Sequence, residues 1–173
     1  MTGRAVRRRS SALLVPVPEA EAAVGEWRQR ADPSAAKGVP AHITVLYPFL
    51  RPRRVAESDH EGLARAAASV PAFDYTLRSV GRFPGVVYLA PEPAGPFAAL
   101  LKAVQQGWPG LEPYGGRFDS YVPHLTVSDG QEPDGMAAAV EAALPISARA
   151  EELVLMVEDR RGRWSPSGRF PLG

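Results

Sequence analysis

One phrase occurs twice in this 173-residue chain, and it constrains the fold more than any other feature. The segment Pro40-Ala41-His42-Ile43-Thr44-Val45 returns as Pro123-His124-Leu125-Thr126-Val127, with the two histidines 82 residues apart. The chain has only three histidines and four threonines, so two copies of His-x-Thr are rarely produced by chance. A phrase found once in each half predicts two structurally related lobes.

Each copy of the phrase follows a loop and is rich in β-branched residues, which is typical of a β-strand. Side chains alternate across a strand, so in each copy the histidine and the threonine share one face. The two apolar residues share the other face and anchor the strand in its lobe. We therefore expect two outward-facing polar pairs, His42 with Thr44 and His124 with Thr126.

The rest of the chain reads as short strands alternating with helices. Strands are expected at residues 11–17, 41–47, 73–78, 85–90, 124–128, 152–157 and 163–170, and helices at 19–30, 58–69, 97–106 and 133–143. The second helix is expected to open on Ser58-Asp59-His60-Glu61, a capping box. Helices gathered with mostly antiparallel strands predict an α+β fold rather than a doubly wound parallel sheet. We expect one bilobal domain over residues 1–173, with residues 1–10 as a flexible basic tail.

Composition excludes several classes of protein. A net charge of +1 does not indicate a nucleic-acid binder through bulk electrostatics. The absence of cysteine excludes disulfides, thiolate nucleophiles and cysteine-ligated zinc. No apolar run reaches the roughly 20 residues of a membrane span, and Pro16 and Pro18 interrupt the first apolar run too early for an export signal. We expect a cytoplasmic monomer with no membrane contact and no obligate protein partner.

Two imidazoles that face each other offer one neutral base and one protonated acid, because histidine titrates near about 6.5. Phosphodiester cleavage needs that pair, since one group activates the attacking oxygen and the other protonates the leaving oxygen. The threonine hydroxyls can donate to the non-bridging phosphate oxygens. This chemistry requires no metal and no cofactor.

Metal binding is the rival interpretation of two histidines. Neither HxH nor HxxxH spacing occurs, and Asp129 is near His124 whereas His42 has no close carboxylate. Two histidines could still share one zinc ion with a distant carboxylate. A Ser-His-Asp hydrolase is disfavoured because the chain lacks a Gly-x-Ser-x-Gly elbow.

The two motifs resemble those of the two-histidine phosphoesterase superfamily, which includes 2′-5′ RNA ligase-like proteins and cyclic nucleotide phosphodiesterases. That group carries two His-x-Thr/Ser-x motifs with a hydrophobic last position, as in His42–Val45 and His124–Val127. Residues 40–49, PAHITVLYPF, are especially similar to the first motif of the ligase-like branch. The resemblance implies a bilobal fold with a central cleft, no metal cofactor, and a nucleotide or RNA-end phosphoester as substrate.

One departure concerns the residues after the second motif. Several ligase-like relatives have a basic residue there, whereas this chain has Ser128-Asp129-Gly130. Another cation is then expected to meet the substrate phosphate. Ligation is a poor inference from the resemblance, because members commonly hydrolyse or open nucleotide phosphates.

Further substrate contacts are expected from aromatic and basic residues. The candidates are Tyr88, Tyr121, Trp164, Arg82, Arg117 and Arg160. An aromatic ring can stack on a base and an arginine can bind a phosphate, while burial in the core and exposure to solvent are the respective alternatives. Tyr47 is expected to point with Ile43 and Val45 toward the core, and His60 to lie on a helix surface.

Three functions remain open from the sequence. The first is an enzyme that opens 2′,3′-cyclic phosphates or cleaves 2′-5′ linkages on RNA ends or small nucleotides. The second is a non-catalytic RNA- or nucleotide-binding module with the same cleft. The third is an enzyme acting on another phosphoester, including cyclic oligonucleotide signals. Two titratable groups favour an enzyme, because binding alone does not need them.

Overall fold

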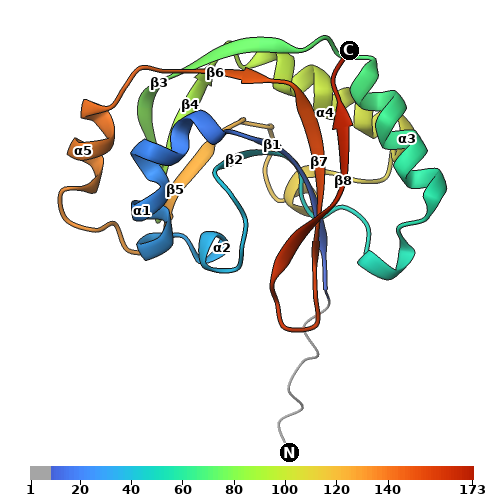
Figure 1. Ribbon diagram of the computed structural model, residues 1–173, viewed down its shortest axis with the longest axis horizontal. Helices are drawn as coiled ribbons and strands as arrows, with labels where there is room; N and C mark the ends of the chain where they lie inside the picture. The colour runs from blue at the N-terminus through green and yellow to red at the C-terminus, as the bar shows by residue number, and fades with distance from the viewer. Residues whose placement is uncertain (1–8) are drawn as a thin grey trace, which may run out of the picture.

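The computed structural model describes residues 9–173, in which strands and helices alternate along the chain (Figure 1). The strands are β1 Ser11–Pro16, β2 His42–Leu46, β3 Phe73–Phe83, β4 Val86–Glu92, β5 Leu125–Asp129, β6 Ile146–Ala150, β7 Glu152–Glu158 and β8 Trp164–Pro171. The α-helices are α1 Glu21–Ala31, α2 Pro33–Ala36, α3 Glu57–Ala68, α4 Gly95–Gly107 and α5 Met136–Ala142. Short 3-10 turns are η1 Pro18–Ala20, η2 Pro52–Arg54 and η3 Pro113–Gly116.

Two antiparallel sheets of four strands form the framework. The first sheet has the order β2-β1-β7-β8 and the second the order β5-β4-β3-β6. Every strand pairing in them is antiparallel. The motif strands β2 and β5 occupy corresponding edges of the two sheets. The predicted α+β fold with two related lobes is therefore confirmed.

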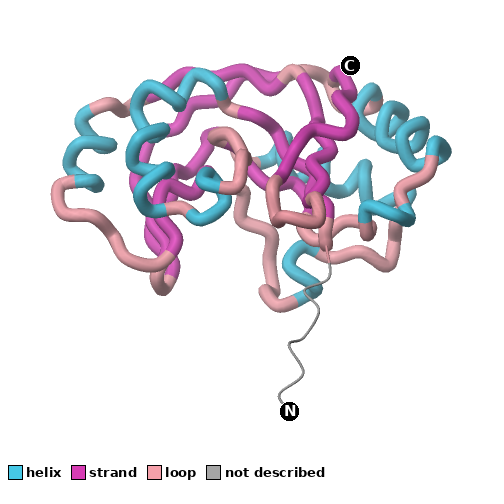
Figure 2. The backbone as a smooth tube through the Cα atoms, turned by 60° about the horizontal axis from the view of Figure 1, so that its bottom comes forward, coloured by secondary structure: helices cyan, strands magenta, loops and turns pink. Residues whose placement is uncertain are grey.

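The helices form two groups, one beside each sheet. Helices α3 and α4 pack together near β8 and β2, and α1 and α5 lie against β5 and β3 (Figure 1). In a view turned by 60°, the strands fill the middle of the molecule and most of the helices lie to the left and right of them (Figure 2). No helix within residues 9–173 is long and apolar enough to cross a membrane.

Helices α1 and α4 each pack against the sheet that does not contain the strand before them. Helix α1 follows β1 of the first sheet but packs against β5 of the second. Helix α4 follows β4 of the second sheet but packs against β2 of the first. Each motif strand is thus supported by a helix that leaves the opposite sheet, which couples the positions of the two motifs.

One contiguous apolar core extends through both lobes. It contains Leu13 and Val15 of β1, Ile43 of β2, and Leu89 and Leu125 of the second sheet, all fully buried. Burying such side chains supplies roughly 1.5–3 kcal/mol each. The apolar faces of β2 and β5 therefore hold the motif strands in place.

A smaller apolar cluster covers the opposite face of the first sheet. It consists of Leu14, Val39, Val154 and Met156, with the partly buried Trp164 against them. Leu14 pairs directly with Thr44 across β1 and β2, and cross-strand partners share a face. This cluster therefore lies on the side of the sheet that carries the polar residues of the first motif.

Three local expectations need correction. The expected strands do not include β6, because its inward residues are the small Ala148 and Ala150, which give a weak alternation of apolar character. Helix α2 lies between the helix expected at 19–30 and the strand expected at 41–47, where no helix is expected. The expected capping box at Ser58 is wrong, since α3 starts at Glu57 and the Asp59 carboxylate accepts a hydrogen bond from the Ala56 amide, 2.8 Å away.

The basic tail expected over residues 1–10 lies mostly outside the described residues, which begin at Arg9. Ser10 is already hydrogen-bonded to the end of β7. Its amide donates to the Glu158 carboxylate over 3.3 Å, and its carbonyl accepts from the Glu158 amide over 3.0 Å. The pairing of the first strand with β7 thus begins one residue before β1.

Candidate active site

Strand β2 presents the first polar pair. His42 and Thr44 are partly exposed, and the apolar residues that follow each of them are fully buried. The entry to the strand is held by Glu21 of α1, whose carboxylate accepts a hydrogen bond from the Ala41 amide over 2.6 Å. The polar face of β2 is therefore oriented by the core on one side and by α1 at its start.

Strand β5 presents the second pair in the same way. His124 directly precedes the strand, and Thr126 lies within it. Leu125 and Val127 are fully buried on the opposite face. Thr126 pairs with Tyr88 of β4 across the sheet, so the Tyr88 side chain lies on the face that carries the second motif.

The two motifs lie close to each other at the adjoining edges of the sheets. Strands β2 and β5 contact each other, and the charge of His124 helps to lower the pKa of His42. Tyr121, from the loop before the second motif, donates a hydrogen bond to the Thr44 carbonyl over 2.8 Å. Burial raises the pKa of Tyr121, so its phenol stays protonated and able to donate. Tyr121 therefore connects the segment before the second motif to the first motif strand.

Both histidines are oriented by the same local hydrogen bond. Nδ1 of His42 lies 2.7 Å from the carbonyl oxygen of Pro40, and Nδ1 of His124 lies 2.7 Å from that of Val122. A carbonyl oxygen only accepts, so each Nδ1 carries the proton and donates it. In the neutral ring Nε2 then has a free lone pair. Each motif thus leaves its Nε2 atom for chemistry and uses Nδ1 for anchoring.

The surroundings favour the neutral form of both rings. The pKa of His42 is lowered to about 4, first by burial and then by the charges of Arg28 and His124, while the Pro40 carbonyl and Asp32 oppose this shift. Burial also lowers the pKa of His124 below 6.5, opposed by the Val122 carbonyl. An anionic ligand between the two rings would raise both pKa values, because it favours the charged form.

Two aromatic rings surround His124. The Phe83 ring lies 5.2 Å from the imidazole and the Tyr88 ring 5.3 Å, both at steep angles. Phe83 and Tyr88 are themselves stacked, with centroids 4.3 Å apart. The structure therefore places Tyr88 beside the second motif, and Phe83 with it.

A second aromatic group lies beside the first motif. Tyr114 neighbours Thr44, whose side chain counters the rise that burial causes in the pKa of Tyr114, and the Tyr114 ring contacts Tyr47 at 6.5 Å and Phe118 at 5.5 Å. Tyr47 also contacts Trp164 at 6.2 Å. Phe118 is 62% exposed. An aromatic surface thus extends outward from Thr44.

The expectation that Tyr47 points into the core is wrong. Tyr47 is only partly buried and packs on other aromatic rings, whereas Val45 and Leu46 are both fully buried. The alternation of the strand ends at Leu46, so the residue after it no longer follows the inward face. His60 is also only partly a surface residue, because its ring contacts Phe170 at 5.9 Å.

The three predicted arginines are exposed in the structure. Arg82 is exposed and forms a 3.2 Å ion pair with Glu132, and alternation along β3 puts it on the face opposite Phe83. Arg117 and Arg160 are exposed, the first in the loop that follows η3 and the second in the turn between β7 and β8. Across residues 9–173, the hydrogen bonds of the two motif imidazoles go to backbone carbonyls and to none of these three arginines.

Sequence reasoning missed three residues that touch the motifs: Arg28, Phe83 and Tyr114. Arg28 of α1 is buried and donates to the Thr126 carbonyl. A signal for it was present, since Arg28 and Asp32 have the i, i+4 spacing of a helical ion pair. Phe83 and Tyr114 offered no comparable signal, because their neighbours come from other strands and loops.

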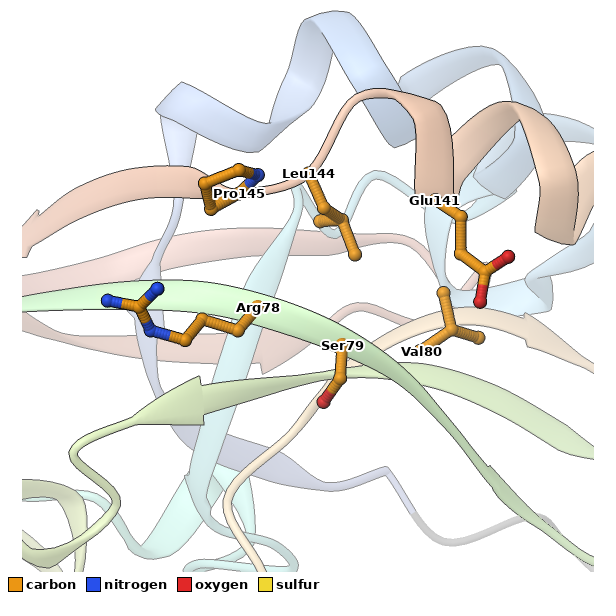
Figure 3. A pocket seen from close by; sticks show the side chains of 6 residues that line it. All are labelled: Arg78, Ser79, Val80, Glu141, Leu144 and Pro145. Carbon is orange, nitrogen blue, oxygen red and sulfur yellow. The ribbon is translucent and has the colours of Figure 1, made fainter.

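Among residues 9–173, no group of three or more His, Cys, Asp or Glu side chains could hold a metal ion. Two surface pockets lie apart from the motifs. An open pocket of about 560 Å³ lies between β3 and the end of α5 with the segment after it, and Figure 3 shows the side chains that line it, namely those of Arg78, Ser79, Val80, Glu141, Leu144 and Pro145. No motif residue lines it. A second pocket, near Tyr75 and Arg149, is also outside the motifs.

The sequence matches the model of the 2′-5′ RNA ligase superfamily over residues 16–162. No curated protein matches it significantly. Solved structures similar to it cover nearly the whole chain, which indicates a common architecture from β1 to β8.

LigT of E. coli, crystallised with 3′-AMP, is 20% identical, with a TM-score of 0.64 over 95% of this chain and 98% of that chain. TT0787 of Thermus thermophilus is 22% identical, with a TM-score of 0.65 over 94% and 97%. A crystal structure described as a phosphoesterase is 21% identical, with a TM-score of 0.60 over 96% and 99%. At these identities the likeness shows the fold.

Proposed function

Because the chain belongs to the 2′-5′ RNA ligase superfamily, we propose that it is a metal-independent phosphoesterase. Its substrates are cyclic or 2′-5′ phosphodiester bonds of RNA ends or small nucleotides. His42 and His124 are the acid–base pair, and Thr44 and Thr126 bind the phosphate. The substrate phosphorus lies between the two motif strands.

The observation that carries this proposal is the matched anchoring of the two imidazoles. Both Nδ1 atoms donate to a carbonyl oxygen two residues upstream, at the same 2.7 Å distance. Within residues 9–173, no hydrogen bond occupies either Nε2 atom. A neutral Nε2 accepts a proton from the attacking hydroxyl or water, and a protonated one delivers a proton to the leaving oxygen. Two rings held alike can divide these tasks.

Thr44 and Thr126 stand on the same faces as the histidines and supply hydroxyl donors. Charge grows on the non-bridging oxygens as the phosphorus becomes five-coordinate, and donors already in place stabilise that charge.

A nucleoside is supported as part of the substrate by the aromatic rings on both sides. Phe83 and Tyr88 flank His124, and Tyr114 with the exposed Phe118 extends from Thr44. Stacking on such rings stabilises a base by roughly 1–3 kcal/mol. Structures of LigT have been solved with 3′-AMP, NADP+ and ATP. These ligands support a nucleotide substrate here.

The test is a screen of purified protein with linear and cyclic substrates in the presence of a chelator. Nucleoside 2′,3′-cyclic phosphates, 2′-5′ and 3′-5′ dinucleotides, and cyclic dinucleotides form the panel. We expect turnover of at least one 2′,3′-cyclic or 2′-5′ substrate, undiminished by chelation. Saturable binding without turnover of any substrate would instead identify a binding module. Turnover that is lost in chelator and restored by added metal would identify a metalloenzyme.

A further inference from the structure

Arg28 is the most deeply buried cation of the described chain that contacts the motifs. Its side chain is 2% exposed, and that of its ion-pair partner Asp32 is 4% exposed. Removing a guanidinium from water is costly unless its donors are satisfied. A buried arginine therefore persists only where several acceptors are held around it.

The first acceptor is Asp32, one turn further along. Nη2 and Nε of Arg28 donate to Asp32 Oδ2 over 2.8 and 3.2 Å. Asp32 is fixed in turn, because it accepts from the amide and the hydroxyl of Ser34 at the start of α2, each over 2.9 Å. The ion pair is thus a rigid unit and not a flexible surface contact.

Ser34 Oγ also accepts from Nη2 of Arg28 over 3.3 Å, and two further acceptors belong to the two motif segments. Nη1 of Arg28 donates to the Val39 carbonyl over 3.3 Å, and Nε donates to the Thr126 carbonyl over 3.2 Å. Val39 lies three residues before His42, and Thr126 two residues after His124. One guanidinium therefore bridges the approach to the first motif and the strand of the second, which belong to different sheets.

The same charge acts on His42. After burial, Arg28 is the largest cause that lowers the pKa of His42. The other charged or titratable groups around this ring are Asp32, which opposes Arg28, and His124, which acts with it. Glu21 of α1 is engaged by the Ala41 amide. The balance of these groups keeps His42 unprotonated in the free protein.

We propose that Arg28 is a positioning residue, which sets the spacing of the two motif segments and holds His42 as the proton acceptor of the pair. This inference rests on the proposed phosphoesterase function. Arg28 reaches the reaction through Val39 and Thr126 and touches no substrate atom. The planar guanidinium is required for this role, because an ammonium group cannot serve the Val39, Thr126 and Asp32 acceptors in one plane.

Three variants separate position from charge. Arg28→Lys keeps the positive charge but loses the planar guanidinium that donates to several acceptors. Arg28→Met with Asp32→Asn removes both charges and avoids a lone buried carboxylate. Arg30→Met is the matched control, since Arg30 lies on the same helix and is exposed. Thermal unfolding and circular dichroism show whether each variant is folded.

Two readouts are used, and one needs no substrate. The pKa of His42 is measured from its ring Cε1–H signal by NMR, assigned with His42→Gln among only three histidines. We expect about 4 in the wild type, a higher pKa in the double variant, and no change in Arg30→Met. With a substrate, Arg28→Lys should lower kcat on the order of tenfold or more with little change in KM. The acid limb of kcat/KM should move to higher pH in the double variant.

The outcomes distinguish this inference from the proposed function. An unchanged His42 pKa in a folded double variant, together with wild-type kcat in Arg28→Lys, overturns the role of Arg28 while the function stands. If the alkaline limb of the pH profile moves in place of the acid limb, His42 is the proton donor, and its assignment as proton acceptor is overturned. A raised His42 pKa without turnover of any substrate by the wild type supports the electrostatic role and counts against the function. If the double variant does not fold, Arg28→Lys alone decides, since loss of kcat supports the positioning role and full kcat refutes it.

Discussion

The ring of Tyr88 occupies the space in which a Cβ atom on Gly81 would lie. The two residues are paired across β3 and β4, and the missing side chain lets the ring lie over the neighbouring strand. In this position Tyr88 stacks on Phe83 at 4.3 Å and contacts His124 at 5.3 Å. A glycine thus determines where the aromatic neighbours of a motif histidine lie.

Substitution of Gly81 by alanine should therefore displace the aromatic pair. The added methyl group clashes with the Tyr88 ring, so the contacts of Tyr88 with Phe83 and His124 must change. We expect Gly81→Ala to lower kcat/KM by about tenfold, because small displacements in a site are costly, while the protein remains folded. Gly110→Ala is the control, since nothing lies within 4 Å of a Cβ atom there. Equal kcat/KM in both variants would show that the position of Tyr88 is unimportant.

The motif threonines should contribute through their hydroxyl groups alone. Thr44→Val and Thr126→Val keep the shape of the side chain and remove one donor each. We expect losses of about 10–100-fold in kcat/KM, because each substitution removes one donor to the charge that develops on the phosphate oxygens. Steady-state kinetics on a cleaved substrate measures the effect. Thr76→Val, on a partly exposed threonine of β3, should have no effect, and a comparable loss there would mean that the hydroxyls act through stability.

The maximum of kcat/KM as a function of pH should lie below neutral pH. The profile of kcat/KM reports the free enzyme, in which the pKa of His42 is about 4 and that of His124 is below 6.5. Activity should rise with pH as His42 loses its proton near 4 and should fall as His124 loses its proton below 6.5. The limbs of kcat should lie at higher pH, because bound phosphate favours both imidazolium forms. A kcat/KM profile centred above about 7 would contradict these environments.

The sequence was sufficient to predict the two motif strands and their polar faces. Alternation around Ile43 and Leu125 identifies the inward side from local pattern alone. The same rule failed one step later at Tyr47, because Val45 and Leu46 are both buried and the strand ends there. The alternation of apolar and polar residues therefore predicts which way a side chain points only within the strand itself.

Arg28 illustrates what local pattern cannot supply. A charged residue on a helix is expected in solvent, and only the spacing to Asp32 hinted at a pair. Its burial depends on the Val39 and Thr126 carbonyls, which are 11 and 98 residues away in sequence. Phe83 likewise reaches His124 from another strand. Such contacts are set by how the sheets and helices meet.

The acid–base role of His42 and His124 is tested most directly by single-turnover kinetics of His42→Ala, His124→Ala and the double variant. The substrate is one that the wild type cleaves, and the assay contains a chelator. Each single variant should be slower by about 100-fold or more, and the double variant scarcely worse than the slower single variant, because the two groups act as a unit. His60→Ala, at the third histidine, which packs on Phe170, should keep wild-type turnover. Full turnover in either motif variant would show that the paired-histidine account is wrong.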